Sequence, residues 1–274
     1  MTKRAAIIAL CAAAVGASHG EEIDKGAFSA SVSAEIASGY LASSGAIYDT
    51  MPVSAQEFYW LLDLGDYGYF DGYAWFISAL HNRQNDIHRP LLNEFEGAIR
   101  YGMDFSPMKD LKIRTKAGPL WNPPIGYHGS HQNVWGPYIN QSFDNPFVTP
   151  YWAGLWLLAP HMRGRIVMGL RRSFAATETV TITPFIETVW MDRRRFNARY
   201  GGDPEIDHFF GGTFATISTG IKSSWRFAKD WSLYASILQF DVINSQARKA
   251  LHKHSVYYEK CDWPIAKIGV SYDF

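Results

Sequence analysis

The sequence predicts an all-β protein, a single closed antiparallel transmembrane β-barrel of about 12 strands, with short turns at one end and longer loops at the other. Three observations predict this fold. Apolar and polar residues alternate along most of the chain, short and long connections take turns, and Phe274 ends an alternating segment. Aromatic residues make up 15% of the chain, and its mean hydropathy is −0.16. Such a low hydropathy argues against a bundle of membrane helices, each of which needs about 20 apolar residues in a row.

The N-terminus is predicted to be a secretory signal peptide, residues 1–20, which leaves residues 21–274 as one barrel domain. Lys3 and Arg4 precede a short apolar run, Ala5–Ala17, and small residues surround the expected cleavage site after Gly20. Its removal takes away Cys11, so Cys261 is expected to be alone in the exported chain, without an internal disulfide. The formal net charge of the full chain is zero, and no nucleic-acid partner is expected.

The predicted strands are recognised by their period of two. In the cleanest segment, Phe28, Val32 and Ile36 lie on one face, while Ser33 and Glu35 lie on the other. The segments expected to form strands are 26–41, 53–65, 68–82, 91–105, 110–122, 132–144, 147–159, 162–175, 178–192, 211–228, 231–244 and 261–274.

The connections between these segments alternate in length, as they do in a barrel that crosses an outer membrane. The short ones are expected at 66–68, 106–109, 145–146, 176–177 and 229–230. The long ones are expected at 42–52, 83–90, 123–131, 193–210 and 245–260, with a tight turn at 160–161 on the same side. Closure is expected because lipid offers no partner for backbone N–H and C=O groups, so the last strand must pair with the first.

The final segment, with Ile268, Val270, Tyr272 and Phe274 on one face, resembles the sorting signal of Gram-negative outer-membrane proteins. The resemblance implies that the barrel-assembly machinery reads this segment and that the mature chain lies in the outer membrane, among its lipid and lipopolysaccharide. The stretches "NPFVTPYWAGLW" and "RIVMGLRRSFAATETVTITPFIETVW" resemble TorF-like porins in their Thr-Pro strands and tight hairpin. That resemblance implies a channel.

Placing the apolar face of each strand toward lipid makes the other face lumenal. The first strands then supply an acidic wall made of Glu35, Glu57, Asp63, Asp71, Glu94, Glu96 and Asp104, with Arg100 as their only base. Later strands supply a basic wall made of Lys112, Arg114, Lys116, Arg165, Arg171, Lys222, Arg226 and Lys267. We expect Glu35 to approach Lys267 across the seam between first and last strands, and Glu94 and Glu96 to meet Arg114 and Lys116.

Three functions remain open at this point. A porin-like channel would use the two walls to favour small polar or zwitterionic solutes, because a field of both signs acts on dipoles. A structural or adhesive barrel would instead be plugged by charge pairs. A lipid hydrolase would use Ser130 as nucleophile and His128 as base, since "YHGSHQNVWGPYIN" resembles the catalytic segment of outer-membrane phospholipase A. In that family Asn-Gly follows the Ser, whereas this chain has His131-Gln132, so no enzyme is expected.

No cofactor and no metal site are expected. There is no CxxC motif and no Cys/His cluster with zinc-ligand spacing, and the pair His252 and His254 stands alone.

Overall fold

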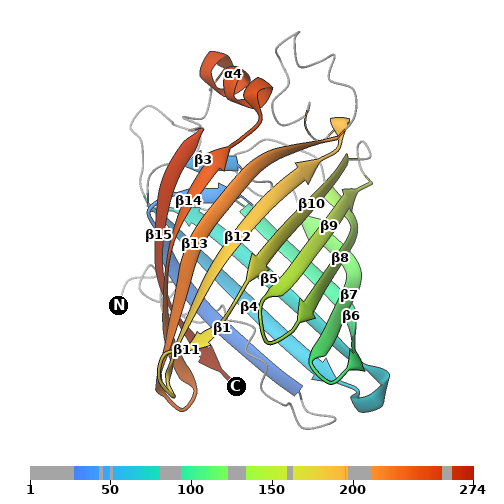
Figure 1. Cartoon of the computed structure of the whole chain (residues 1–274). Coiled ribbons are helices and arrows are strands. Elements are labelled where there is room, and N and C mark those ends of the chain that lie inside the picture. Colours follow the sequence, from blue (N-terminus) through green and yellow to red (C-terminus); the bar gives the residue numbers. More distant parts are fainter. Residues whose placement is uncertain are drawn as a thin grey trace.

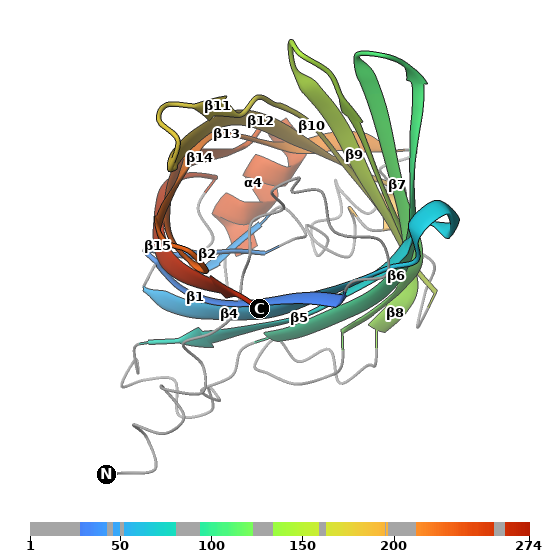
Figure 2. The same ribbon diagram turned by 90° about the horizontal axis from the view of Figure 1, so that it is seen from below.

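A computed structural model of the chain describes residues 28–42, 46–49, 52–80, 94–122, 134–158, 163–194, 196, 212–254 and 261–274. Within these residues, one antiparallel sheet of thirteen strands closes on itself through the pairing of β10 with β12 (Figures 1 and 2). Twelve of the strands form the wall, and the two-residue β11 (Phe174–Ala175) is an extra strand on the edge of β12. The predicted fold is therefore confirmed.

Each predicted segment corresponds to one strand of the wall, although β6 continues to Met108, into the turn predicted at 106–109. The strands are β1 (Phe28–Ala37), β4 (Val53–Asp63), β5 (Tyr69–Ala79), β6 (Glu94–Met108), β7 (Leu111–Asn122), β8 (Val134–Asp144), β9 (Thr149–Leu157), β10 (Arg163–Arg171), β12 (Val180–Met191), β13 (Thr213–Ala228), β14 (Trp231–Val242) and β15 (Asp262–Asp273). Neighbours along the chain are neighbours in the sheet, so the topology is up-and-down throughout.

At the short-turn end, the turn between β4 and β5 is formed by residues that favour turns. A 3₁₀ turn, η1 (Gly65–Tyr67), joins β4 to β5, and Gly65 and Gly68 have φ angles of 64° and 87°. These left-handed conformations favour glycine because it has no Cβ. Asp63 accepts a hydrogen bond of 2.8 Å from the backbone N–H of Gly65. Asp63 therefore caps this turn.

The long-loop end carries two elements that the alternation does not predict. A small sheet pairs β2 (Tyr40–Ala42) with β3 (Ala46–Asp49), and a helix, α4 (Ser245–His254), follows β14. Figure 1 places α4 above the strand ends, and Figure 2 places it within the outline of the ring, so it lies across the mouth of the barrel. Asn244 caps it, because its Oδ1 accepts 3.0 Å hydrogen bonds from the N–H groups of Gln246 and Ala247.

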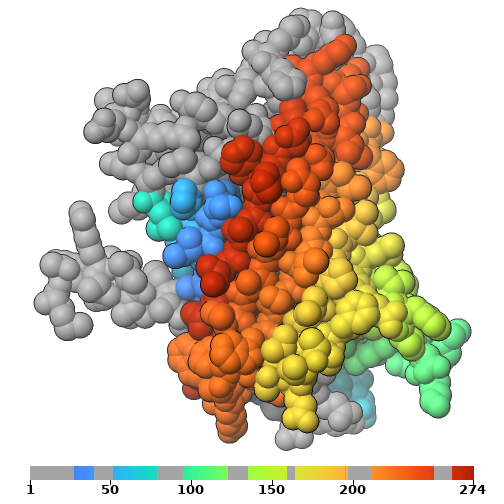
Figure 3. Space-filling model, turned by 60° about the vertical axis from the view of Figure 1, so that its left-hand side comes forward, coloured from blue at the N-terminus to red at the C-terminus, as the bar shows by residue number. Residues whose placement is uncertain are grey.

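The seam between the ends of the chain forms as predicted. β15 pairs with β1 in a continuous register that places Ser271 opposite Ser33, and Figure 3 shows the red β15 running beside the blue β1. The backbone N–H of Phe274 donates a hydrogen bond of 2.8 Å to the carbonyl oxygen of Ala30. The pairing thus continues to the last residue.

The outward face of the wall is apolar. Ile99, Ile221, Ile237 and Ile268 are each more than half exposed, while their polar neighbours in sequence point the other way. Aromatic side chains gather at the short-turn end, where the ring of Tyr272 lies 4.9 Å from those of both Trp231 and Phe274. Barrels that face a bilayer carry such an apolar band bounded by aromatic residues.

On the inner face, some tyrosine rings lie flat on glycines of the neighbouring strand. Tyr151 of β9 lies opposite Gly169 of β10, and a Cβ at Gly169 would lie 2.5 Å from the ring. The hydroxyl then reaches past β10 and donates to Glu187 of β12. Tyr234 of β14 lies over Gly269 in the same way and reaches Ser33, 3.0 Å away. Each tyrosine thereby ties three strands together.

Candidate functional site

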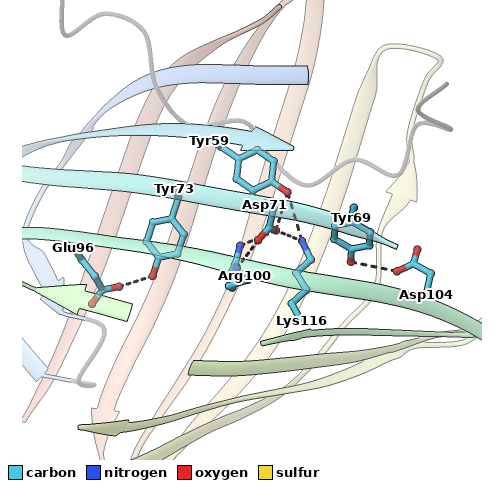
Figure 4. Close-up of polar contacts among 8 residues, drawn as sticks. All are labelled: Tyr59, Tyr69, Asp71, Tyr73, Glu96, Arg100, Asp104 and Lys116. Carbon is cyan, nitrogen blue, oxygen red and sulfur yellow. Dashed lines mark hydrogen bonds and ion pairs between the residues drawn. The ribbon is translucent and has the colours of Figure 1, made fainter. Parts of the chain in front are cut away.

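The inner face of the barrel is the candidate site, and its most buried charge among the described residues is Asp71, near the short-turn end of β5. Arg100 of β6 donates to Asp71 from Nε at 2.7 Å and from its terminal nitrogen at 2.9 Å, while Nζ of Lys116 on β7 lies 2.6 Å away. Tyr59 of β4 donates a fourth hydrogen bond of 3.0 Å. Figure 4 shows the four side chains converging from four neighbouring strands. Asp71 is 0% exposed, so this cluster belongs to the barrel's internal structure.

The remaining charges of this part of the wall also pair locally. Lys112 lies 2.8 Å from Asp104, and Arg114 lies 2.8 Å from Asp144. Tyr69 donates a hydrogen bond of 3.3 Å to Asp104, and Tyr73 donates one of 2.8 Å to Glu96 (Figure 4). At the seam, Lys267 donates to Glu35 at 2.9 Å, as predicted.

Arg114 and Lys116 do not pair with the predicted acids, Glu94 and Glu96, but with other acids. Lys116 lies opposite Gly102 in the sheet, six residues along β6 from Glu96, which is about 20 Å of extended strand. The register therefore brings Lys116 to Asp71 and Arg114 to Asp144. The side chain of Glu94 lies outside the described residues.

The basic side chains on β10 and β13 have a different environment. The guanidinium of Arg171 lies 5.2 Å from the ring centre of Tyr151, and Nζ of Lys222 lies 5.0 Å from that of Phe185. Lys222 and Arg226 are exposed although they belong to the inner set of β13. The protein thus leaves part of both side chains uncovered beside β13. Glu57 is half-buried on the inner face of β4, four strands away from β13 around the ring.

Buried apolar residues line the long-loop end of the lumen, and we call them the outer belt. They are Ala37, Val53, Ala55, Ile77, Leu120, Leu155, Leu157, Val189, Met191, Ala215, Leu238, Phe240, Val242 and Ile265. Each lies in the half of its strand nearest the long loops. The two charged walls predicted from the sequence include none of these belt residues.

Elements of the long loops cover the outer belt. Phe196, in the connection after β12, and Ala247 of α4 are both 0% exposed and belong to the same apolar cluster. Beyond its cap, α4 is fixed by Arg248, which lies 3.1 Å from Asp262 at the start of β15. Cys261 is buried beside it, with Sγ 3.8 Å from the carbonyl oxygen of Arg248. Hydrophobic packing thus anchors the helix at the mouth.

The other sequence candidates receive little from the structure. His128 and Ser130 lie outside the described residues. So do residues 1–20, the predicted signal peptide. Among the residues that are described, no group of three or more His, Cys, Asp or Glu side chains could hold a metal ion. No helix in the described part of the chain is long and apolar enough to cross a membrane.

The chain matches no family model and no curated protein sequence. Among solved structures it is similar to the COG4313 outer membrane channel from Pseudomonas putida F1, with a TM-score of 0.53 and 9% identity over 95% of this chain and 100% of that one. It also resembles the KdgM porin (TM-score 0.47, 11% identity, 90% and 99% covered) and the NanC porin (0.47, 11%, 89% and 98%). The first similarity establishes a fold shared with an outer-membrane channel. Membership of the TorF-like porins stays a prediction.

Proposed function

We propose that the protein is a porin-like channel of the Gram-negative outer membrane, through which small polar or zwitterionic solutes diffuse. The observation that carries this proposal is the exposure of Lys222, on the inner set of β13 and beside the ring of Phe185. A charged side chain that the protein leaves exposed inside a closed barrel supports a wet lumen. The shared fold with a known channel supports the same function.

The arrangement of the remaining charges supports a preference for dipoles. Asp71, Asp104 and Glu35 are engaged by bases of neighbouring strands. Glu57 on β4 and Lys222 on β13 have no ion pair with a described residue, and their strands lie four positions apart in the ring of twelve. We propose that the acidic and basic walls act through such residues as a transverse field, which favours solutes that carry both signs.

Planar-bilayer conductance of the refolded mature chain tests this function. A steady ohmic current from heat-modifiable, folded protein is expected, with a reversal potential near zero in a salt gradient because both signs of charge line the path. A folded barrel that remains electrically silent would contradict the proposal.

The alternative is a non-conducting structural or adhesive barrel, and the outer belt is the observation that favours it. Part of the buried belt packs with Ala247 of α4, so a plug at this end of the lumen would be apolar. Silence in the bilayer experiment, followed by current after removal of α4, would identify a closed channel. Silence in both proteins would favour the structural barrel.

Outer-membrane placement, cleavage after Gly20 and recognition by the barrel-assembly machinery are parts of the same proposal. The apolar outward face and the aromatic cluster around Tyr272 support the membrane placement. The third candidate, a lipid hydrolase, is tested by assaying phospholipase activity with Ser130→Ala and His128→Ala. We expect no activity that depends on these residues.

A further inference from the structure

Arg165 on β10 is a buried charge inside an apolar environment. Its register neighbours are Leu155 of β9 and Met191 of β12, both members of the outer belt. Arg165 itself is only 6% exposed. Val167, two residues along the same strand, packs against the belt. Arg165 therefore introduces a permanent positive charge into the outer belt, which otherwise consists of apolar side chains.

No described residue forms an ion pair or hydrogen bond with the guanidinium of Arg165. This contrasts with Arg100, equally buried, which is paired with Asp71 through two nitrogens. Burying a guanidinium without a counter-charge is strongly unfavourable, and buried charges in proteins are normally paired. A lumenal guanidinium that has no counter-charge among the described residues is a candidate binding group for an anion.

A second donor lies near Arg165. Tyr138 on β8 faces the lumen, packs against Leu155 and the adjoining belt residues, and lies within electrostatic reach of Arg165. Its hydroxyl has no hydrogen-bond partner among the described residues. Arg165 and Tyr138 lie on either side of Leu155 in the sheet. A guanidinium and a phenol in this apolar surrounding match a carboxylate, because small-molecule sites combine mostly apolar linings with a few polar groups that fix orientation.

We propose that Arg165 and Tyr138 bind the carboxylate of a solute whose apolar body lies against the outer belt. The proposal rests on the proposed channel function, since it places the subsite on the solute's path. It narrows the solute class to carboxylates with an aliphatic or aromatic body. Zwitterionic amino acids with apolar side chains belong to this class, and so do the corresponding monoanionic acids.

The test is equilibrium binding by titration calorimetry to the refolded mature chain in detergent. The probes are 3-phenylpropionate, L-phenylalanine, acetate, which lacks the body, and 3-phenylpropanol, which lacks the charge. We expect 3-phenylpropionate to bind at least about tenfold more tightly than acetate or the alcohol, a factor worth one strong polar or apolar contact. If both 3-phenylpropionate and L-phenylalanine bind, the site accepts zwitterionic solutes. If only 3-phenylpropionate binds, the site accepts monoanions.

Matched variants locate the site. Arg165→Gln should weaken 3-phenylpropionate binding about tenfold or more, and Tyr138→Phe should weaken it severalfold, because charge-assisted hydrogen bonds are the stronger ones. Arg171→Gln is the control, since it removes a lumenal guanidinium that lies over Tyr151 below the belt. Equal binding by wild type and Arg165→Gln, or no binding by the wild type, would overturn the proposal.

A stability measurement supplies an independent readout. Without solute, Arg165→Met should resist urea better than the wild type, because it replaces an unpaired buried charge by an apolar side chain of similar length. A variant that is less stable than the wild type would show that Arg165 is already paired, and the proposal would fail. Binding is measured at equilibrium, so a barrel that binds the acid but carries no current would refute only the channel function.

Discussion

Removing the carboxylate of Asp71 should destabilise the barrel more than removing any exposed lumenal acid. Asp71→Ala would leave Arg100, 9% exposed, and Lys116 as two neighbouring cations without their common partner. Removing one member of a buried ion pair typically costs about 3–5 kcal/mol, because the charge that stays is uncompensated. We expect a loss of that size in the free energy of unfolding.

Asp104→Ala is the matched control. Asp104 also pairs with a lysine, at 2.8 Å, but the side chains of Asp104 and Lys112 are 28% and 44% exposed. Such partly solvated pairs are worth about 0–1 kcal/mol. The two aspartates therefore share their chemistry and differ in burial.

Urea unfolding of barrels refolded into lipid vesicles, followed by tryptophan fluorescence, measures both losses. If Asp71→Ala and Asp104→Ala lose the same free energy within about 1 kcal/mol, burial of the cluster does not govern its contribution, contrary to the argument for breaking a buried pair. A further variant combines Asp71→Leu with Arg100→Met and Lys116→Met. We expect it to recover most of the stability, since well-packed apolar residues can replace a buried ionic cluster.

Four further predictions follow from individual contacts. Deleting Phe274 should sharply lower the amount of heat-modifiable barrel in the outer membrane without changing synthesis, and normal amounts would refute a role in assembly. Gly169→Val should cost about 1–3 kcal/mol in the urea assay, because its side chain overlaps the ring of Tyr151; an unchanged midpoint would contradict this. Lys222→Glu should shift the reversal potential toward cation preference, and no shift in a conducting protein would exclude Lys222 from the path. Replacing α4 by a Gly-Ser linker should raise conductance, whereas an unchanged current would show that the helix does not obstruct the mouth.

The alternation of side chains was sufficient to predict the wall of the barrel. Each predicted segment holds one strand, and the pairing of Glu35 with Lys267 follows from closing the first strand on the last. The partners of Arg114 and Lys116 could not be predicted, because they depend on register. β6 and β7 change register between Phe105 and Met108, and such an irregularity leaves only a weak trace in the sequence.

The outer belt and α4 escaped prediction for a different reason. Val53 and Ala55 occupy inner positions of β4, but a period of two indicates only which face a residue takes and not what covers it. The helix has one local signal, Asn244 before Ser245, which is a favourable N-cap. Its burial of Ala247 against the belt is a tertiary contact, and tertiary contacts of this kind are absent from local sequence patterns.

The lumen differs between its charged part and the outer belt, and this difference constrains selection. Exposed charges such as Lys222 lie outside the outer belt, where water screens them and a solute keeps its hydration. The Asp71 cluster connects four neighbouring strands, and its charges already have partners. The outer belt offers no hydrogen bonds to a polar solute, so a fully polar molecule must lose its hydration there without compensation. A solute with an apolar body loses less, and Arg165 can compensate one negative charge. The barrier between solutes therefore lies at the belt, and substitutions there should change which solute passes more than substitutions of the exposed charges, which change how fast ions arrive.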